Sequence, residues 1–243
     1  MSDRFVRTRM LLGSDAMEKL KKSKVAVFGL GGVGGSAAEA LARSGVGKLE
    51  LIDRDTVALS NLNRQIIATE KTLGMPKVEA AKARILEIDP EIEVTTRFVF
   101  YTTETVDEFD LGGYDYIIDA IDTVTGKLHL VQRAMAAGTP IISAMGAGNK
   151  LDPTAFVVTD ISKTLDCPLA RIMRKELGKR GIKHLKVVYS REKAMAPHYD
   201  ECDEALEHRR QIPGSVAFVP PVAGFILAGE VIKDLTGVRN EQN

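Results

Sequence analysis

The sequence predicts an α/β fold: a doubly wound, mostly parallel sheet followed by a C-terminal α/β extension. Over the first 150 residues, runs rich in Val, Ile, Phe and Tyr alternate with amphipathic helical patterns. Strands that alternate with helices run parallel and are joined by right-handed crossovers. The expected strands are residues 24–30, 48–55, 93–102, 114–122 and 139–148, and the expected helices are residues 36–45, 76–89 and 126–138.

The pattern changes after Asn149. Two further strand-like runs, residues 154–162 and 185–192, flank a helical pattern over residues 167–181. A polar stretch from Ser190 to Gly214 follows, which we expect to be a mobile loop over a functional face. The sequence therefore predicts a single domain over residues 1–243, with residues 1–150 as its first half and residues 151–243 as its extension.

Composition excludes several classes of protein. Lys and Arg together equal Asp and Glu at 33 each, so no global field attracts nucleic acid or a membrane surface. Two cysteines exclude a disulfide framework and a four-cysteine zinc site. The N-terminus lacks a signal-peptide core, and the apolar run over residues 215–232 carries Pro220, Pro221 and Glu230. The helix that could follow these prolines is too short to span a bilayer, so we expect a cytoplasmic protein without a membrane partner.

Three glycines indicate a bound nucleotide. Gly29, Gly31 and Gly34 form a G-x-G-x-x-G pattern directly after a strand and before a helix. In this Rossmann-like pattern the first glycine allows the tight turn, the second lets the backbone approach a phosphate, and the third allows close helix packing. Asp53 ends the next strand, where a carboxylate accepts hydrogen bonds from a ribose. This unit alone does not distinguish NAD from ATP.

The charged residues that follow favour ATP. Asn61, Arg64 and Lys77 come just after the second strand, and a triphosphate needs such cations more than a dinucleotide does. Asp119 and Asp122 lie where the fourth strand meets its loop, beside the expected crevice. Either carboxylate is a candidate ligand for Mg²⁺.

At this point the sequence resembles the ubiquitin-activating-enzyme-like adenylyltransferases, the family of ThiF, MoeB and HesA. The motifs that carry the resemblance are "RFVR", "GLGGVGG", "LIDRDTVALSNLNRQ", "GMPKVEAA" and "DAIDT", over the first 150 residues. The resemblance implies that the glycine turn, with Gly31, holds ATP and that Asp53 binds the ribose. It further implies that Asn61, Arg64 and Lys77 contact the phosphates, that Asp122 holds Mg²⁺, and that Arg7 reaches the site of a second subunit in a homodimer. Thr123 departs from the Asn often found there in relatives.

Two substrates stay open at the level of the first 150 residues. Activators of ubiquitin-like sulfur-carrier proteins often carry two C-x-x-C pairs, which this chain lacks. The C-terminal third instead is similar to a group within the family, the tRNA threonylcarbamoyladenosine dehydratases. That similarity implies a partner tRNA carrying threonylcarbamoyladenosine (t6A), whose carboxylate is adenylated and then closes a ring with loss of water. The alternative is adenylation of a sulfur-carrier C-terminus.

Two features of the C-terminal third bear on this choice. A basic stripe is the footprint expected for RNA phosphates, although a solvated helix face explains it equally well. Cys167 precedes Pro168 at an expected helix start, where it is either a nucleophile or, as we favour, a small buried residue. The stripe comprises Arg171, Arg174, Lys175, Lys179, Arg180, Lys183 and Lys186.

Overall fold

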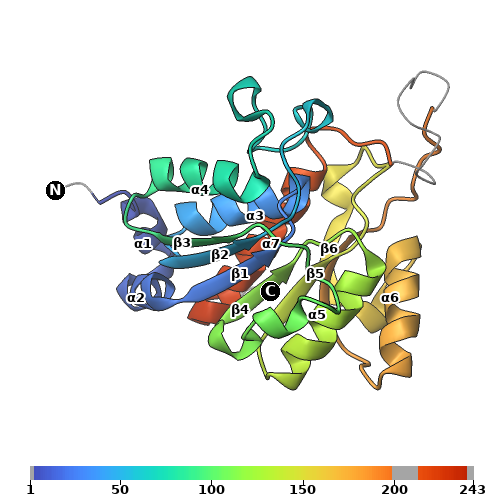
Figure 1. The fold of residues 1–243 in the computed structure, drawn as a ribbon. Coiled ribbons are helices and arrows are strands. Elements are labelled where there is room, and N and C mark those ends of the chain that lie inside the picture. The colour runs from blue at the N-terminus through green and yellow to red at the C-terminus, as the bar shows by residue number, and fades with distance from the viewer. Residues whose placement is uncertain (1–2, 199–212, 240–243) are drawn as a thin grey trace.

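The computed structural model describes residues 3–198 and 213–239, and it confirms the doubly wound α/β class (Figure 1). Seven strands form one sheet in the order β3-β2-β1-β4-β5-β7-β6. All neighbours pair in parallel except β6 and β7, which are antiparallel. The strands are β1 (Lys24–Phe28), β2 (Lys48–Ile52), β3 (Glu93–Arg97), β4 (Tyr116–Asp119), β5 (Ile141–Ala144), β6 (Phe156–Asp160) and β7 (Lys186–Ser190).

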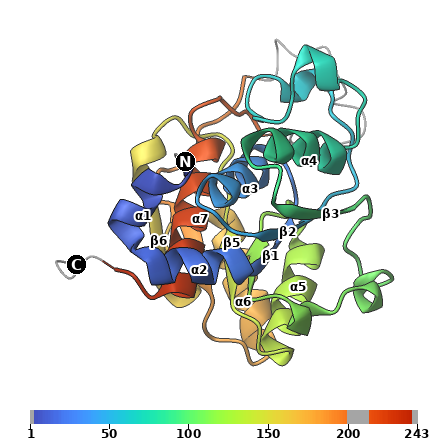
Figure 2. The same cartoon turned by 90° about the vertical axis from the view of Figure 1, so that its left-hand side faces the viewer.

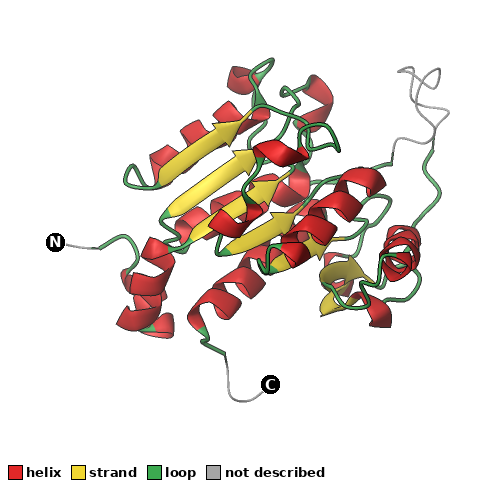
Figure 3. Cartoon of the chain, turned by 60° about the horizontal axis from the view of Figure 1, so that its bottom comes forward, coloured by secondary structure: helices red, strands yellow, loops and turns green. Residues whose placement is uncertain are grey.

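Helices cover both faces of this sheet, as Figures 2 and 3 show. α3 and α4 pack with α7 on one face, and α5 and α6 pack on the other. The helices are α1 (Val6–Leu12), α2 (Ser14–Lys22), α3 (Gly32–Arg43), α4 (Lys77–Ile88), α5 (Val124–Ala136), α6 (Pro168–Lys179) and α7 (Pro220–Thr236). No helix in the described residues combines the length and the apolar character needed to cross a membrane.

The alternation of side chains along β1 shows why both faces are apolar. Val25 and Val27 join the core beneath α3 and α7, whereas Ala26 and Phe28 join the core beneath α5 and α6. Successive side chains of a strand point to opposite faces. A strand buried on both faces is therefore a continuous apolar run, as "VAVF" is.

The strand order places a crevice beside β1. β1 lies between β2 and β4. The chain passes from β1 through α3 to β2 on one side of β1, and later from β3 to β4 on its other side. In open α/β sheets, ligands bind outside the carboxyl ends of the strands at this point of reversal.

Most of the expected boundaries differ from the observed ones by a few residues, and two of these differences bear on the site. β3 ends at Arg97, not at residue 102, because its neighbour β2 ends at Ile52 and offers no further hydrogen bonds. α3 begins at Gly32, not at Ser36, so part of the glycine turn forms the first turn of the helix. Both differences matter for the site, because Val99, Phe100 and Tyr101 beyond the end of β3 and Gly32 at the start of α3 line the pocket described below.

Candidate nucleotide-binding site

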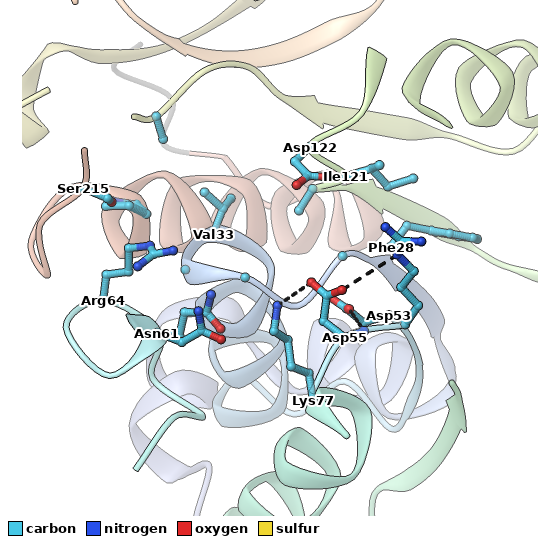
Figure 4. A pocket seen from close by; sticks show the side chains of 18 of the residues that line it. Phe28, Val33, Asp53, Asp55, Asn61, Arg64, Lys77, Ile121, Asp122 and Ser215 are labelled. Carbon is cyan, nitrogen blue, oxygen red and sulfur yellow. Dashed lines mark hydrogen bonds and ion pairs between the residues drawn. The ribbon is translucent and has the colours of Figure 1, made fainter. Parts of the chain in front are cut away.

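A pocket of about 770 Å³ opens at the carboxyl ends of β1, β2 and β4 (Figure 4). It collects most of the predicted site residues: Gly29, Gly31, Asp53, Asn61, Arg64, Lys77 and Asp122. Volumes of about 300–1,000 Å³ are typical of pockets for small molecules and cofactors. The chain therefore assembles, from segments far apart in the sequence, a cavity large enough for a nucleotide.

The glycine turn closes one wall of the pocket. Gly29 has φ +89°, and a Cβ atom there would lie 2.6 Å from the carbonyl oxygen of Ala120. A Cβ on Gly34 would lie 1.8 Å from the carbonyl oxygen of Gly29. By contrast, Gly31 has no neighbour closer than 4.0 Å to such an atom, since it faces the cavity. Gly34 thus allows α3 to pack on the turn itself, which brings the helix N-terminus to the pocket wall, where it favours an anion.

Asp53 is held by the backbone. One carboxylate oxygen accepts a hydrogen bond from the Leu30 N–H at 2.6 Å, and the other accepts from the Asp55 N–H at 2.8 Å. Burial raises the pKa of Asp53 above its usual value, although nearby Lys77 and these two N–H groups act in the opposite direction. The carboxylate is therefore fixed between the glycine turn and β2, with lone pairs left to accept ribose hydroxyls.

Lys77 is the first residue of α4, and its side chain is only 7% exposed. Its Nζ atom lies 2.9 Å from Asp55 Oδ2, an ion pair drawn in Figure 4. The Asp55 side chain is itself 56% exposed, so it is free to turn towards water. A phosphate entering the pocket would compete with Asp55 for the ammonium group of Lys77.

Arg64 lies on the opposite side of the pocket from Asp53 (Figure 4). Its guanidinium donates to the Ser60 carbonyl oxygen at 2.6 Å and to Asn63 Oδ1 at 2.9 Å. It forms no ion pair with any described carboxylate, and burial lowers its pKa below the ordinary value. Asn61 is buried nearby, where its side-chain oxygen accepts from the Ala58 N–H. An unpaired, half-buried guanidinium beside a cavity is suited to binding an anion.

The two aspartates after β4 have different positions. Asp122 is exposed, lines the pocket and makes no ion pair with the described part of the chain. Asp119 is fully buried, pairs with Lys127 and is not among the described residues that line the pocket. Of the two candidate metal ligands, only Asp122 is available.

The residues around Asp122 fit Mg²⁺ but not a metal held by the protein alone. Across residues 3–198 and 213–239, no three His, Cys, Asp or Glu side chains gather as a metal cluster. Mg²⁺ is usually bound by one or two carboxylates together with substrate phosphates. Asp122 offers one free carboxylate for Mg²⁺, and Lys77 and Arg64 across the cavity would hold the phosphates that supply the other ligands.

Arg7 is exposed on α1 and is not among the described residues that line the pocket. The expectation that it serves the site of a second subunit therefore stays a prediction.

The sequence did not identify one wall of the pocket, and it anticipated the other only as a loop over a functional face. Val99, Phe100 and Tyr101 continue the chain beyond the end of β3 and form one wall. The Arg54 guanidinium lies 3.9 Å from the centre of the Phe100 ring at this end. Pro213, Ser215 and Pro220 of the C-terminal segment form the other wall. The aromatic run "FVFY" is a signal that could have marked the first wall, whereas the second depends on contacts between distant segments.

One hydrogen-bond cluster holds the C-terminal wall. Asn149, with φ +59°, exchanges hydrogen bonds with Gly214 through both its backbone N–H and its side-chain oxygen. Its carbonyl oxygen accepts from the Met195 N–H at 2.8 Å. Residues 199–212, most of the loop expected to be mobile, lie outside the described residues.

The predicted basic stripe is divided in the structure. Arg174 donates to the Thr164 hydroxyl and carbonyl oxygens, and Lys186 forms ion pairs with Glu230 and Asp234. These two cations are used within the fold. Lys179 and Arg180 both form ion pairs with Glu176. The basic residues that stay exposed on one side of α6 are spaced four residues apart, and we term them the α6 ridge: Arg171, Lys175 and Lys179.

Cys167 occupies the N-cap position of α6 and is only 4% exposed. It packs in the core beneath α5 and α6. Its position agrees with the interpretation as a small buried residue.

Comparison with known proteins identifies relatives of the whole chain. The model of the ThiF family matches residues 5–243. The tRNA threonylcarbamoyladenosine dehydratase of Bacillus subtilis is 46% identical over 97% of this chain and 95% of that protein. The protein of the same name from Escherichia coli is 35% identical over 96% of this chain and 93% of that protein. The molybdopterin-synthase adenylyltransferase of E. coli is 36% identical but covers only 60% of this chain.

Solved structures agree with these sequence relatives. The crystal structure of the E. coli dehydratase in complex with AMP superimposes with a TM-score of 0.86 at 35% identity, covering 96% of this chain and 94% of that one. The complex of the same protein with ATP gives the same TM-score at 34% identity, with the same coverage. The similarity to the dehydratases thus extends over nearly the whole chain, including its C-terminal third.

Proposed function

The chain belongs to the ThiF family, and from that premise we propose that it is an ATP-dependent tRNA threonylcarbamoyladenosine dehydratase. One observation carries the proposal: a pocket that joins the α3 N-terminus, a fixed carboxylate and two cations, in a chain similar over nearly its whole length to dehydratases of this name. A structure of one of these relatives contains ATP. The protein acts on tRNA that carries t6A.

The reaction needs a better leaving group on a carboxylate. The t6A carboxylate oxygen attacks the α-phosphorus of ATP, which forms an acyl adenylate and releases pyrophosphate. The carbamoyl group of the same side chain then attacks the acyl carbon, AMP leaves, and a five-membered ring closes. In sum, the substrate loses one water while ATP becomes AMP and pyrophosphate. Because the nucleophile is internal to the substrate, the enzyme needs no nucleophile of its own, which is consistent with the burial of Cys167.

The roles of the side chains follow from their charges. Lys77, Arg64 and the N-terminus of α3 would stabilise the negative charge of the phosphates and of the leaving pyrophosphate. Asp53, held by two N–H groups, would accept hydrogen bonds from the ribose and so fix the nucleoside. Asp122 would hold Mg²⁺, which neutralises phosphate charge when bound.

A homodimer is part of the proposal. α1 buries none of its side chains within the described structure, and Met10 and Leu11 are 78% and 84% exposed. An apolar helix face of this kind favours a second copy of the chain as its cover. Arg7, on the same helix, would then approach the phosphates of the partner. The arrangement is supported by the resemblance of the "RFVR" motif to the family pattern.

The test of the function is a comparison of substrates. With ATP and Mg²⁺, we expect pyrophosphate release to depend on tRNA that carries t6A, and the modified nucleoside to lose the mass of one water. Unmodified tRNA and a small protein ending in Gly-Gly are the controls. Pyrophosphate release that depends on the small protein, with no change in the tRNA nucleosides, would instead support the sulfur-carrier alternative.

Variants test the assignments within the site. Asp53→Ala should weaken ATP binding, since it removes the ribose acceptor. Asp122→Ala should abolish turnover and keep much of the affinity for the nucleotide measured without Mg²⁺, since it removes only the metal ligand. Calorimetry and pyrophosphate assays measure the two effects, and wild-type activity in both variants would mean that the ATP site is misassigned.

A further inference from the structure

A buried ion pair lies directly behind the loop that carries Asp122. Asp119 is the last residue of β4, and Lys127 lies in the first turns of α5. Both side chains are 0% exposed, and Asp119 Oδ2 lies 3.0 Å from Lys127 Nζ. The nucleotide chemistry proposed above uses neither residue.

The pair holds both polar backbone groups of one residue. Asp119 Oδ1 accepts a hydrogen bond from the Ile121 N–H at 3.2 Å. Lys127 Nζ donates to the Ile121 carbonyl oxygen at 3.1 Å. Ile121 lines the pocket and immediately precedes Asp122. The peptide group that leads into Asp122 is thus held by Lys127, and the one before it by Asp119.

The start of the same loop is fixed from the other side. The Ala120 N–H donates to the Phe28 carbonyl oxygen at 2.8 Å, and the Ala120 carbonyl lies against Gly29 so closely that a Cβ there would lie 2.6 Å away. Ala120 therefore contacts the glycine turn, and Ile121 is held by the ion pair. Asp122 follows as the first residue whose side chain is exposed.

The energetics argue against a role in stability alone. Removing two charges from water is costly, and apolar residues of similar volume are often neutral or more stabilising than a buried ion pair. Leu and Met would fill this part of the core without that cost. What they could not do is donate to the Ile121 carbonyl and accept from the Ile121 N–H.

We propose that Asp119 and Lys127 are positioning residues that hold the loop over residues 120–122. They keep the Asp122 carboxylate directed into the pocket, towards the side where Lys77 and Arg64 would bind the phosphates. The inference rests on the proposed function in one respect, the assignment of Asp122 to Mg²⁺. Neither Asp119 nor Lys127 is among the described residues that line the pocket. Both act through the backbone of Ile121.

The first test is hydrogen–deuterium exchange of the free protein. In wild type, the Ile121 amide should be protected, since it donates to a buried carboxylate. In the double variant Asp119→Leu/Lys127→Met, which keeps the core neutral and apolar, this amide should exchange at least about tenfold faster. Rapid exchange in wild type, at the rate of a fully exposed loop, would overturn the proposal without any variant.

The second test measures the effect of Mg²⁺ on ATP affinity by calorimetry, with EDTA as the metal-free condition. In EDTA, the ATP affinity of the double variant should stay within about twofold of wild type. The increase in ATP affinity on adding Mg²⁺ should be at least about tenfold smaller in the double variant than in wild type. Lys127→Arg, which keeps the charge and the donors, should retain most of that gain. A double variant that folds, as judged by circular dichroism, with wild-type exchange and a wild-type Mg²⁺ effect would overturn the proposal.

The chain offers a control in the same sheet. Glu50 is also buried, and it forms ion pairs with the partly exposed Lys24 at 3.0 Å and with Arg97; none of these three residues is among the described residues lining the pocket. Lys24→Met/Glu50→Leu should leave the Mg²⁺ effect unchanged; an equal loss in this control would mean that lowered stability explains the result.

Asp122→Asn separates the two proposals. If it keeps the Mg²⁺ effect, the metal assignment fails; if it loses the effect while the Asp119/Lys127 double variant does not, only the positioning role fails.

Discussion

We expect opposite effects from replacing two adjacent glycines of α3, Gly34 and Gly35, with alanine. Replacing Gly by Ala inside a helix stabilises it by about 0.5–1 kcal/mol when space is available. A Cβ on Gly35 would have its nearest neighbour at 3.6 Å, an ordinary contact with Ile67 Cγ2. Gly35→Ala should therefore raise the free energy of unfolding by about 0.5–1 kcal/mol and the melting temperature by about 1–4 °C.

Gly34→Ala should have the reverse effect. Its Cβ would lie 1.8 Å from the carbonyl oxygen of Gly29, a backbone atom that cannot rotate away. Gly29 cannot retreat either, since its N–H donates to the Ile52 carbonyl oxygen at 2.8 Å and its α-carbon lies against Ala120. α3 must therefore move outward. Overpacking of this kind costs about 1–3 kcal/mol or more, which exceeds the helix-propensity gain.

The same movement displaces the N-terminus of α3 from the nucleotide. We expect Gly34→Ala to weaken ATP binding by at least about tenfold, equivalent to about 1.4 kcal/mol, while Gly35→Ala stays within about twofold of wild type. Urea unfolding measures the stability of both variants, and calorimetry measures their affinity. If Gly34→Ala matched Gly35→Ala in both measurements, the contact between helix and turn would not determine the geometry of the pocket.

The remaining predictions concern the dimer, the RNA surface and pH. Mixing inactive Arg7→Ala with inactive Lys77→Ala subunits should restore activity through one intact site per dimer; no recovery after subunit exchange, or a monomer in light scattering, would contradict it. Replacing the three residues of the α6 ridge with Gln should weaken tRNA binding and reduce its salt dependence in filter binding, with ATP affinity unchanged. Arg174→Gln should instead mainly lower stability, because this side chain is bonded within the fold; an unchanged salt slope in the ridge variant would make the ridge a solvated surface only. For Asp53, burial raises the folded pKa above the unfolded value of about 3.8. The folded protein then binds more protons just above that pH, so the contribution of Asp53 to stability falls as pH rises through this window. Asp53→Asn should lack this fall in urea titrations against pH, and a parallel pH profile in wild type and variant would contradict the assignment.

Local sequence patterns were sufficient to predict which residues meet along one side of the pocket. The G-x-G-x-x-G turn, the carboxylate at the end of the second strand and the cations that follow all depend on short-range relations between a strand, its turn and its helix. Parallel strands bring their carboxyl ends to one edge of the sheet, so residues at those ends meet even though the sequence separates them. Asp53, Asn61, Arg64 and Lys77 accordingly line one pocket.

The tertiary structure alone decided which of two similar residues is available. Asp119 and Asp122 are three positions apart and have the same chemistry, yet Asp119 ends β4 facing the core, where Lys127 neutralises it, while Asp122 lies in the loop beyond. Arg174 and Lys186 were equally indistinguishable in sequence from the basic residues that stay exposed. Whether a charge is buried and paired depends on elements brought together across the fold, Asp234 and Lys186 being one example. Composition and periodicity along one segment do not contain that information, because packing between distant segments determines it.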